Sequence, residues 1–149
     1  MSPDPTQEVC SVRVGETLYG IPIAHLLEIV GKPGREPIPL APSFIGGLVH
    51  YRGEVLAAVS LRRLLGLEPA GAAEDVLVFE GASEQFGVMV DAVGEILNVS
   101  AADFEPNPAT LNPRLQALFS GVWKLSDRLL IRLEPERLDP MHLISACPV

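Results

Sequence analysis

The sequence has few of the residues that build disulfide scaffolds or zinc sites. Its two cysteines, Cys10 and Cys147, lie near opposite ends of the 149 residues, and its three histidines show no metal-ligand spacing relative to one another. Two distant cysteines without a neighbouring ligand set argue against a disulfide framework and against a zinc centre. We therefore expect no metal and no cofactor, and we interpret the thiols as buried or incidental.

Long apolar runs are also missing, although the chain is 48% hydrophobic and has a mean hydropathy of +0.29. No run approaches the roughly 18 to 20 residues that a membrane-spanning helix needs. Residues 1–8 (MSPDPTQE) lack the basic and apolar regions of a secretory signal. The sequence therefore predicts a cytoplasmic protein that does not insert into the membrane, with a disordered start over residues 1–8.

Positive charge is absent from a third of the chain. Between Leu64 and Pro113 there is no lysine or arginine, whereas nine acidic residues occur there, and the net charge is −8. Nucleic-acid binding depends on cationic side chains that displace counterions from phosphates. We therefore exclude nucleic acid as a partner and interpret the acidity mainly as a solvated surface.

Motifs of enzymatic chemistry are missing as well. The chain has no glycine-rich phosphate loop, no Ser-His-Asp set within a supporting motif and no metal cluster. The many acidic residues leave a paired-carboxylate site open, because spacing alone does not exclude it. A protein without catalytic activity is the favoured interpretation.

What the chain does contain is an internal repeat, which takes priority in fold assignment. Residues 19–30 (YGIPIAHLLEIV) align with residues 86–97 (FGVMVDAVGEIL) at an offset of 67. Residues 47–59 (GLVHYRGEVLAAV) align with residues 121–133 (GVWKLSDRLLIRL) at an offset of 74. The two matches occur in the same order, and a longer second connecting loop explains the change of offset. We conclude that the chain is a duplicated unit.

Each repeat reads as short strands with glycine and proline between them. Residues 9–14 alternate as a strand does, and residues 23–30 carry the i, i+3, i+4, i+7 apolar pattern of a short helix. Residues 47–59 predict a hairpin that turns at Arg52-Gly53, because glycine permits the positive φ of tight turns. A helical turn follows at residues 61–66. This pattern predicts a mainly β fold of two small barrels, and it leaves open whether the barrels exchange strands.

Taken together, these motifs resemble the CheW family of chemotaxis adaptor proteins. Residues 44–67 (FIGGLVHYRGEVLAAVSLRRLLGL) carry that family's Phe-Ile-x-Gly start, x-x-Arg-Gly turn and closing x-Leu-Arg in order. The resemblance covers about residues 9–138. It implies a single CheW-like domain at residues 9–140, built of two SH3-like five-stranded β-barrel subdomains at about 15–70 and 76–138 with a hydrophobic seam between them. Residues 141–149 would form a C-terminal tail.

The resemblance also implies partners and a site. CheW-like proteins couple chemoreceptors to a CheA-type histidine kinase whose regulatory domain shares their fold, in arrays that also hold other CheW-like proteins. On matching positions only, the implied receptor-binding residues are Leu26, Glu28, Arg52 and Val88, and the implied kinase-binding residue is Gly47. The protein would then be recruited from the cytoplasm to membrane-bound receptor arrays.

Some positions depart from the family pattern or allow a simpler interpretation. Ser60 stands where the family usually has an aspartate, and Tyr51 is bulkier than the usual aliphatic residue, which suggests a divergent member serving surface sensing or twitching motility. We expect Trp123 to be partly buried in the seam and Asp91 to brace a turn. Glu28 and Glu95, at equivalent repeat positions, fit helix-surface acids as well as contact residues.

Two other classes of protein remain open from the sequence. Two barrels could enclose a ligand pocket, so a small-molecule-binding sensory module is the alternative function. A fragment of the kinase regulatory domain is a further alternative, because that domain has the same fold.

Overall fold

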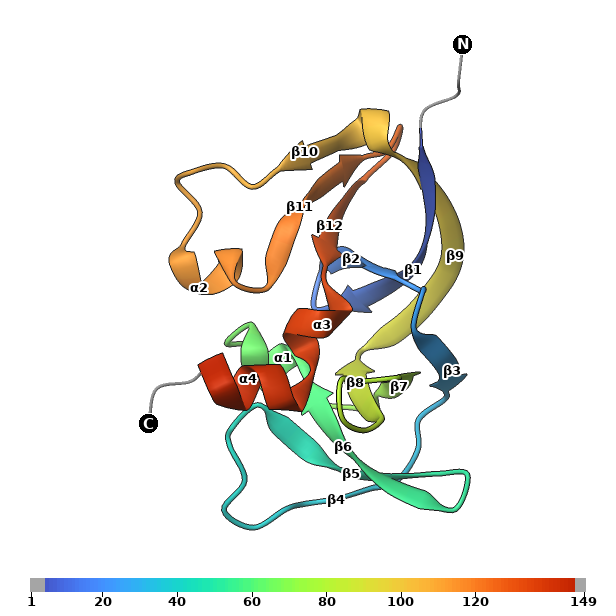
Figure 1. Ribbon diagram of the computed structural model, residues 1–149, viewed down its shortest axis with the longest axis vertical. Helices are drawn as coiled ribbons and strands as arrows, with labels where there is room; N and C mark the ends of the chain where they lie inside the picture. The colour runs from blue at the N-terminus through green and yellow to red at the C-terminus, as the bar shows by residue number, and fades with distance from the viewer. Residues whose placement is uncertain (1–4, 147–149) are drawn as a thin grey trace.

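Two six-stranded β-sheets make up most of the computed structural model, which describes residues 5–146 (Figure 1). In hydrogen-bonding order the first sheet contains β10 (Phe104–Pro106), β11 (Phe119–Lys124), β12 (Leu129–Leu133), β2 (Thr17–Pro22), β1 (Thr6–Val14) and β9 (Ala92–Ser100). The second contains β3 (Leu26–Val30), β7 (Asp75–Phe79), β8 (Phe86–Val90), β6 (Glu54–Ser60), β5 (Ile45–Tyr51) and β4 (Arg35–Glu36). The helical segments are short: α1 (Leu61–Leu64), η1 (Ala101–Asp103), α2 (Pro113–Gln116), α3 (Pro135–Leu138) and α4 (Pro140–Ala146).

Each sheet combines the first hairpin of one repeat with four strands of the other. The first sheet takes β1 and β2 together with β9 to β12, and the second takes β7 and β8 together with β3 to β6. Arg132 pairs with Gly20 in the parallel contact of β12 with β2, and Ala58 pairs with Gly87 in that of β6 with β8. The same offsets of 74 and 67 relate these two pairs. The predicted repeat therefore folds as two equivalent units that exchange their first hairpins.

The sheets correct one expectation about the barrels. Each sheet has six strands instead of five, and within residues 5–146 the pairing runs from one edge strand to the other without closing. The exchange of strands that the sequence left open is present, because β1 and β2, from the first repeat, pair with β9 and β12 of the second. Local sequence patterns specify hairpins, whereas the choice of partner between hairpins depends on long-range packing.

A hydrophobic core joins the two sheets and corresponds to the expected seam. Cys10, Val12 and Val14, which share one face of β1 as predicted, are buried in one cluster with Leu77 and Val88 of the second sheet. Burial raises the pKa of the Cys10 thiol to about 11. A thiol that stays protonated in apolar surroundings acts as a small core residue, which agrees with the interpretation above for Cys10. Cys147 lies outside the described residues.

The helix predicted for residues 23–30 is wrong, because the chain forms strand β3 over Leu26–Val30. Strand β3 pairs with β7 in antiparallel fashion, with Val30 opposite Val76. Leu27 and Ile29 are exposed on the outer face, so the apolar residues of this segment divide between two faces. A run that is apolar on both faces of a strand also satisfies the helical spacing, and pairing with β7 decides the outcome.

Two glycines at equivalent repeat positions allow an edge strand to cross closely over each sheet. Gly47 and Gly121 have φ angles of +149° and +155°, and each follows an irregularity in its strand pairing. A Cβ atom at Gly47 would lie 2.8 Å from the carbonyl oxygen of Glu36 in β4. One at Gly121 would collide with the carbonyl oxygen of Glu105 in β10. Both positions therefore require glycine on two counts, conformation and space.

The ends of the described chain are more ordered than predicted. Strand β1 begins at Thr6, which pairs with Ser100, so the expected disorder over residues 1–8 is wrong from Thr6 onward, and residues 1–4 lie outside the described part. Most of the proposed tail forms α4, whose Leu143 packs against buried residues of both sheets. No helix within residues 5–146 has the length and hydrophobicity that crossing a bilayer takes.

Candidate functional site

The hairpin of β5 and β6 turns tightly at Arg52-Gly53, as the sequence predicts. Both turn residues have positive φ angles, 50° for Arg52 and 79° for Gly53. Two positive φ angles define the turn type whose twist matches that of the flanking strands. A residue with a Cβ atom is disfavoured in this conformation by about 1 kcal/mol or more, so the arginine is held at the tip of the hairpin against its own preference.

Arg52 forms an ion pair with Glu28, which joins two of the proposed receptor-binding residues. Its Nη2 donates a hydrogen bond of 2.6 Å to Oε1 of Glu28, and its guanidinium lies 5.5 Å from the centre of the Tyr51 ring. The hydrogen bond to Glu28 raises the pKa of Arg52 above its ordinary value. Both side chains are exposed enough for water to screen the attraction. The pair therefore fixes the direction of the guanidinium more than it stabilises the fold.

Because Glu28 lies on β3, at one edge of the second sheet, the ion pair shows how strongly this sheet curls. The hairpin tip comes from the opposite side of the sheet order, beyond β7 and β8, yet it reaches β3. Leu26, two residues before Glu28, is partly buried against the central core. Glu28 and Arg52 thus belong to one surface, which we call the β3 surface, whereas Leu26 lies beside it, opposite Phe79 and facing the central core, because the strand pairing shifts between Leu26 and Glu28.

Exposed aliphatic residues accompany this ion pair on the same strands. Leu27 and Ile29 are exposed on β3, and Val55 is exposed on β6 immediately after the turn. The sequence did not identify them as exposed, since the predicted helix assigned Leu27 to its apolar face and residues 47–59 were predicted only as a hairpin. Residues 26–30 (LLEIV) do not alternate between apolar and polar side chains, so the sequence carried no clear signal for the exposed face of β3.

A second ion pair of the same kind occupies the equivalent place on the first sheet. Arg128 Nη2 donates a hydrogen bond of 3.1 Å to Oε1 of Glu95 on edge strand β9. Glu95 aligns with Glu28 in the repeat, and Arg128 lies beside the turn of the β11–β12 hairpin. Arg128 is therefore an internal comparison for Arg52. Both arginines lie at or beside a hairpin turn and pair with a glutamate on an edge strand, but the side chains around the two ion pairs differ.

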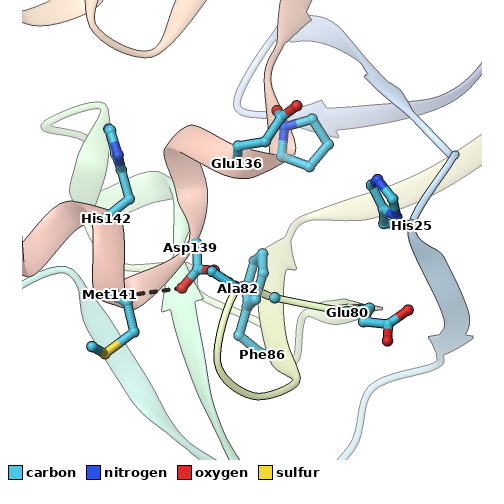
Figure 2. Close-up of a pocket in the computed structure, with 10 residues that line it drawn as sticks. His25, Glu80, Ala82, Phe86, Glu136, Asp139, Met141 and His142 are labelled. Atoms are coloured by element: carbon cyan, nitrogen blue, oxygen red, sulfur yellow. Dashed lines mark hydrogen bonds between the residues drawn. The ribbon is translucent and has the colours of Figure 1, made fainter.

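A cavity of about 730 Å³ opens beside α3 and α4 (Figure 2). Phe86 and Met141 contribute apolar wall, while His25 and His142 stand on opposite sides. Asp139 is buried there, and both of its oxygens accept backbone N–H groups, from Ala82 and Met141, at 2.9 Å. Within residues 5–146 no group of three or more potential metal ligands could hold a metal ion. Asp139 thus serves to hold the β7–β8 turn against α4.

Comparison with known proteins gives consistent matches over nearly the whole chain. The family model described as the CheW-like domain matches residues 8–140. This chain belongs to the CheW family. The chemotaxis protein CheW of Rhizobium meliloti (strain 1021) is 29% identical over 136 residues, which cover 90% of this chain and 88% of that protein. The corresponding protein of Helicobacter pylori (strain ATCC 700392 / 26695) is 31% identical over 127 residues, which cover 84% of this chain and 76% of that protein.

Two further similarities extend the comparison to another curated relative and to a solved structure. Protein FrzA of Myxococcus xanthus is 34% identical over 106 residues, covering 70% of this chain and 66% of FrzA. The crystal structure of the scaffolding protein TtCheW from Thermoanaerobacter tengcongensis superposes with a TM-score of 0.80 at 25% identity. That superposition covers 91% of this chain and 94% of TtCheW. The two-sheet architecture is therefore that of the CheW family.

Two of the positions carried over from the CheW family lie inside the protein. Val88 is completely buried in the core between the sheets, where it pairs with Val59 and Leu77. Gly47 is buried beneath Glu36 of β4. Neither residue offers a side chain to a partner, and neither belongs to the β3 surface. Any part they take in binding has to act through the elements that they support.

Ser60, where the resemblance led us to expect an aspartate, is the N-cap residue of α1. The Ser60 hydroxyl accepts a hydrogen bond of 3.3 Å from the Arg63 amide at the start of α1. Arg63 in turn donates from Nη1 to the Ile45 carbonyl oxygen at 2.8 Å, which ties α1 to the first residue of β5. Serine is an effective N-cap residue, so Ser60 supplies the start of α1 with a hydrogen-bond acceptor and brings no charge to this corner.

Asp91 braces a turn, as expected. Its carboxylate accepts hydrogen bonds from Arg62 Nε at 2.7 Å and Nη2 at 2.6 Å, and from the Gly15 amide at 2.8 Å. The bonds from Arg62, followed by that from Gly15, lower the pKa of Asp91 below its ordinary value, although burial opposes the shift. One carboxylate thus connects α1, the β1–β2 turn and the end of β8.

Proposed function

We propose that this chain is a non-enzymatic adaptor that couples chemoreceptors, the methyl-accepting chemotaxis proteins, to a CheA-type histidine kinase in a chemosensory array. The observation that carries the proposal is the match to the CheW-like domain over residues 8–140. It is supported by the described part of the chain, whose interior is packed with apolar side chains and whose partly buried Asp91 and buried Asp139 are both engaged in structural hydrogen bonds. The protein would act in the cytoplasm at membrane-bound arrays, beside other CheW-like proteins.

The β3 surface is the proposed receptor site. A helical receptor tip needs an apolar surface together with groups that set its orientation. Exposed Leu27 and Ile29 would supply the first from the outer face of edge strand β3, and the guanidinium of Arg52, directed by Glu28, would supply the second from the other face, so the tip would contact both faces of this edge strand. Leu26 would line the inner side of this surface, and buried Val88 would support it from the core. Arginine offers planar donors that suit a carboxylate or a pair of carbonyl oxygens.

The kinase contact is proposed for the opposite end of β5, around Gly47. Arg52 follows Gly47 by five positions, and a strand rises about 3.3 Å per residue, so the two places lie roughly 17 Å apart. At that separation one protein can hold both partners at once. The output of the array is proposed to be chemotaxis or a related system such as surface sensing or twitching motility.

A direct test mixes the purified full-length protein with a receptor-tip fragment and with the regulatory domain of a CheA-type kinase from the same cell. We expect each binary complex and a ternary complex in analytical ultracentrifugation. Interfaces in such arrays are modest singly and add up through multivalency, so micromolar concentrations should be used. The proposal fails if neither partner binds while a small metabolite raises the melting temperature, which would favour the sensory-module alternative.

Replacing Arg52 by alanine is expected to weaken binding of the receptor tip about five-fold or more while the fold stays intact. The side chain is exposed and its ion pair is screened, so the melting temperature should change by no more than about 2 °C. Isothermal titration with the receptor-tip fragment measures the first effect, and thermal unfolding followed by circular dichroism measures the second. A large fall in melting temperature would instead mean that Arg52 braces the hairpin.

Arg128→Ala is the matched control, since Arg128 makes the equivalent ion pair with Glu95 on the first sheet. It should leave receptor binding within a factor of two of the unmodified protein. Equal losses in both variants would indicate a general effect of charge and would argue against a specific site at Arg52.

A further inference from the structure

The loop between β4 and β5 exposes a large apolar side chain in a strained conformation. Leu40 is 104% exposed, the highest value among the large hydrophobic residues of the described chain. Its φ angle is +61°, in the left-handed region that disfavours residues with a Cβ atom. In the free protein neither the backbone conformation nor the exposure of the Leu40 side chain stabilises the fold. Strain that the surrounding structure imposes is a recognised mark of a functional site.

The rest of the loop is built to hold Leu40 in this position. Ile38 and Ala41, on either side, pack against buried residues that include Phe44 and Val59, while the Ala41 amide donates to the Ile38 carbonyl oxygen. Prolines at positions 37, 39 and 42 restrict the backbone further. A loop that is already rigid loses little conformational entropy when a partner binds it.

The absence of charged side chains from the loop favours binding to an apolar surface of a partner. Residues 37–49 contain no charged side chain, although the whole chain has a net charge of −8. Three prolines and Leu40 therefore form an uncharged projection on an acidic protein. Contacts of this kind bury an aliphatic anchor in a pocket, and they depend little on salt.

The position of the loop connects it with the proposed kinase contact. The loop joins β4 to β5, and Gly47 lies where these two antiparallel strands pair, against the Glu36 carbonyl oxygen. Gly47 is buried, so its influence on a partner has to pass through the elements it supports, and the exposed part of those elements is the loop. Figure 1 shows the loop at the lower left, opposite the β5–β6 tip that carries Arg52.

We propose that Leu40 is the apolar anchor by which this chain enters a hydrophobic pocket on the regulatory domain of a CheA-type kinase. Gly47 is a positioning residue in this arrangement, because it allows β4 to cross close to β5 and so directs the loop. The inference rests on the proposed adaptor function and adds to it the residue that touches the kinase. Receptor binding, at the other end of β5, does not involve Leu40.

The test uses the full-length protein, the purified kinase regulatory domain and the receptor-tip fragment. Leu40→Asn removes the apolar side chain and introduces a residue that tolerates the left-handed conformation. We expect binding to the kinase domain to weaken about thirty-fold, the effect of losing a hot-spot side chain. The melting temperature should rise by about 2 °C as the strain is relieved. Leu40→Met should retain kinase binding, and both variants should bind the receptor tip normally.

Leu129→Asn is the control, because it makes the same substitution at another exposed leucine, on the first sheet. Kinase binding that survives Leu40→Asn, or that falls equally with Leu129→Asn, overturns the anchor while the adaptor function stands. Loss of receptor binding instead of kinase binding overturns it too. If the unmodified protein does not bind the kinase domain at all, the adaptor proposal itself fails, and the anchor fails with it.

Discussion

Replacing Trp123 by alanine is expected to lower the free energy of unfolding by about 3 to 5 kcal/mol, the usual loss for a large aromatic residue removed from a core. Trp123 is 2% exposed and belongs to a cluster with Val9, Val99 and Leu130 in the first sheet. The substitution would leave a cavity that the surrounding strands cannot close. Urea unfolding followed by circular dichroism gives the free energy, since the chain has a single tryptophan and the variant loses its fluorescence.

The neighbours of Trp123 explain why relaxation around it is limited. Its ring lies 5.5 Å from that of Phe104 on β10, and the Arg132 guanidinium lies 5.3 Å from its centre. Gly20 on β2 makes room for it, since a Cβ atom there would lie 3.1 Å from Trp123 Cζ3. Aromatic and cationic contacts of this kind add to the energy of burial. The residue is therefore a central core element, and the expectation of only partial burial in the seam is wrong.

Trp123→Phe keeps most of the ring and should cost clearly less than the alanine variant. Val55→Ala, at an exposed position on β6, should change the free energy of unfolding by about 0.5 kcal/mol or less. A loss of less than about 1 kcal/mol for Trp123→Ala would contradict the packing described here.

The repeat and its hairpins could be predicted from the sequence because they depend on local signals. Glycine at positions 53, 47 and 121 marks a turn or a close crossing, and the two-residue alternation of the flanking runs marks the strands. The strand alternation and the glycines at 47 and 121 occur in both copies, so the offsets of 67 and 74 carry over directly into the strand register. Because the unit is duplicated, each predicted element could be checked against the corresponding residues of the other repeat.

The exchange of hairpins between the repeats could not be predicted in the same way. Residues 6–22 have the same local pattern whether β1 pairs within its own repeat or with β9 from the other. Choosing between these arrangements requires the free energy of packing the whole seam, which no local pattern contains. The helix prediction for residues 23–30 failed for a related reason. The pairing of strand β3 (Leu26–Val30) with β7 overrides a spacing of apolar residues that suits a helix equally well.

The candidate site was only partly accessible from the sequence. Glu28 and Arg52 came from the family resemblance, but their contact depends on the curl of the second sheet, since 24 residues separate them. Val88 and Gly47 looked equally suitable in the motif, and only the structure shows that both are buried. Leu40 gave no signal at all, because a leucine among prolines can face either inward or outward.

Replacing Asp91 by alanine is expected to destabilise the protein by about 2 to 3 kcal/mol at neutral pH, because hydrogen bonds to a charged group are worth more than neutral ones. The Asp91 side chain is 9% exposed and that of Arg62 is 19% exposed, so neither group can be fully solvated once its partner is removed. The variant also leaves the Gly15 amide without its acceptor. Asp91→Asn preserves an acceptor for Gly15 and should cost less than alanine.

Exposed Glu105 provides the control, since it makes a 2.7 Å ion pair with Lys124 in which both side chains are more than half exposed. Glu105→Gln should change the free energy of unfolding by less than about 1 kcal/mol. Similar losses for Glu105→Gln and Asp91→Ala would show that burial does not determine the worth of these ion pairs.

The contribution of Asp91 should also depend on pH in one direction. Its pKa in the folded protein is lowered, chiefly by the hydrogen bonds from Arg62, whereas in the unfolded chain it has an ordinary value of about 3.9. The unfolded state therefore takes up the proton first as the pH falls. The stabilisation is fully present above the unfolded-state value and is lost as the pH falls through the lower, folded-state value. Urea unfolding of the unmodified protein and of Asp91→Asn from pH 7 downward should give curves that are separated at neutral pH and converge below about pH 4. Curves that stay equally far apart at low pH would mean that the charge of Asp91 is not what holds α1 to the β1–β2 turn.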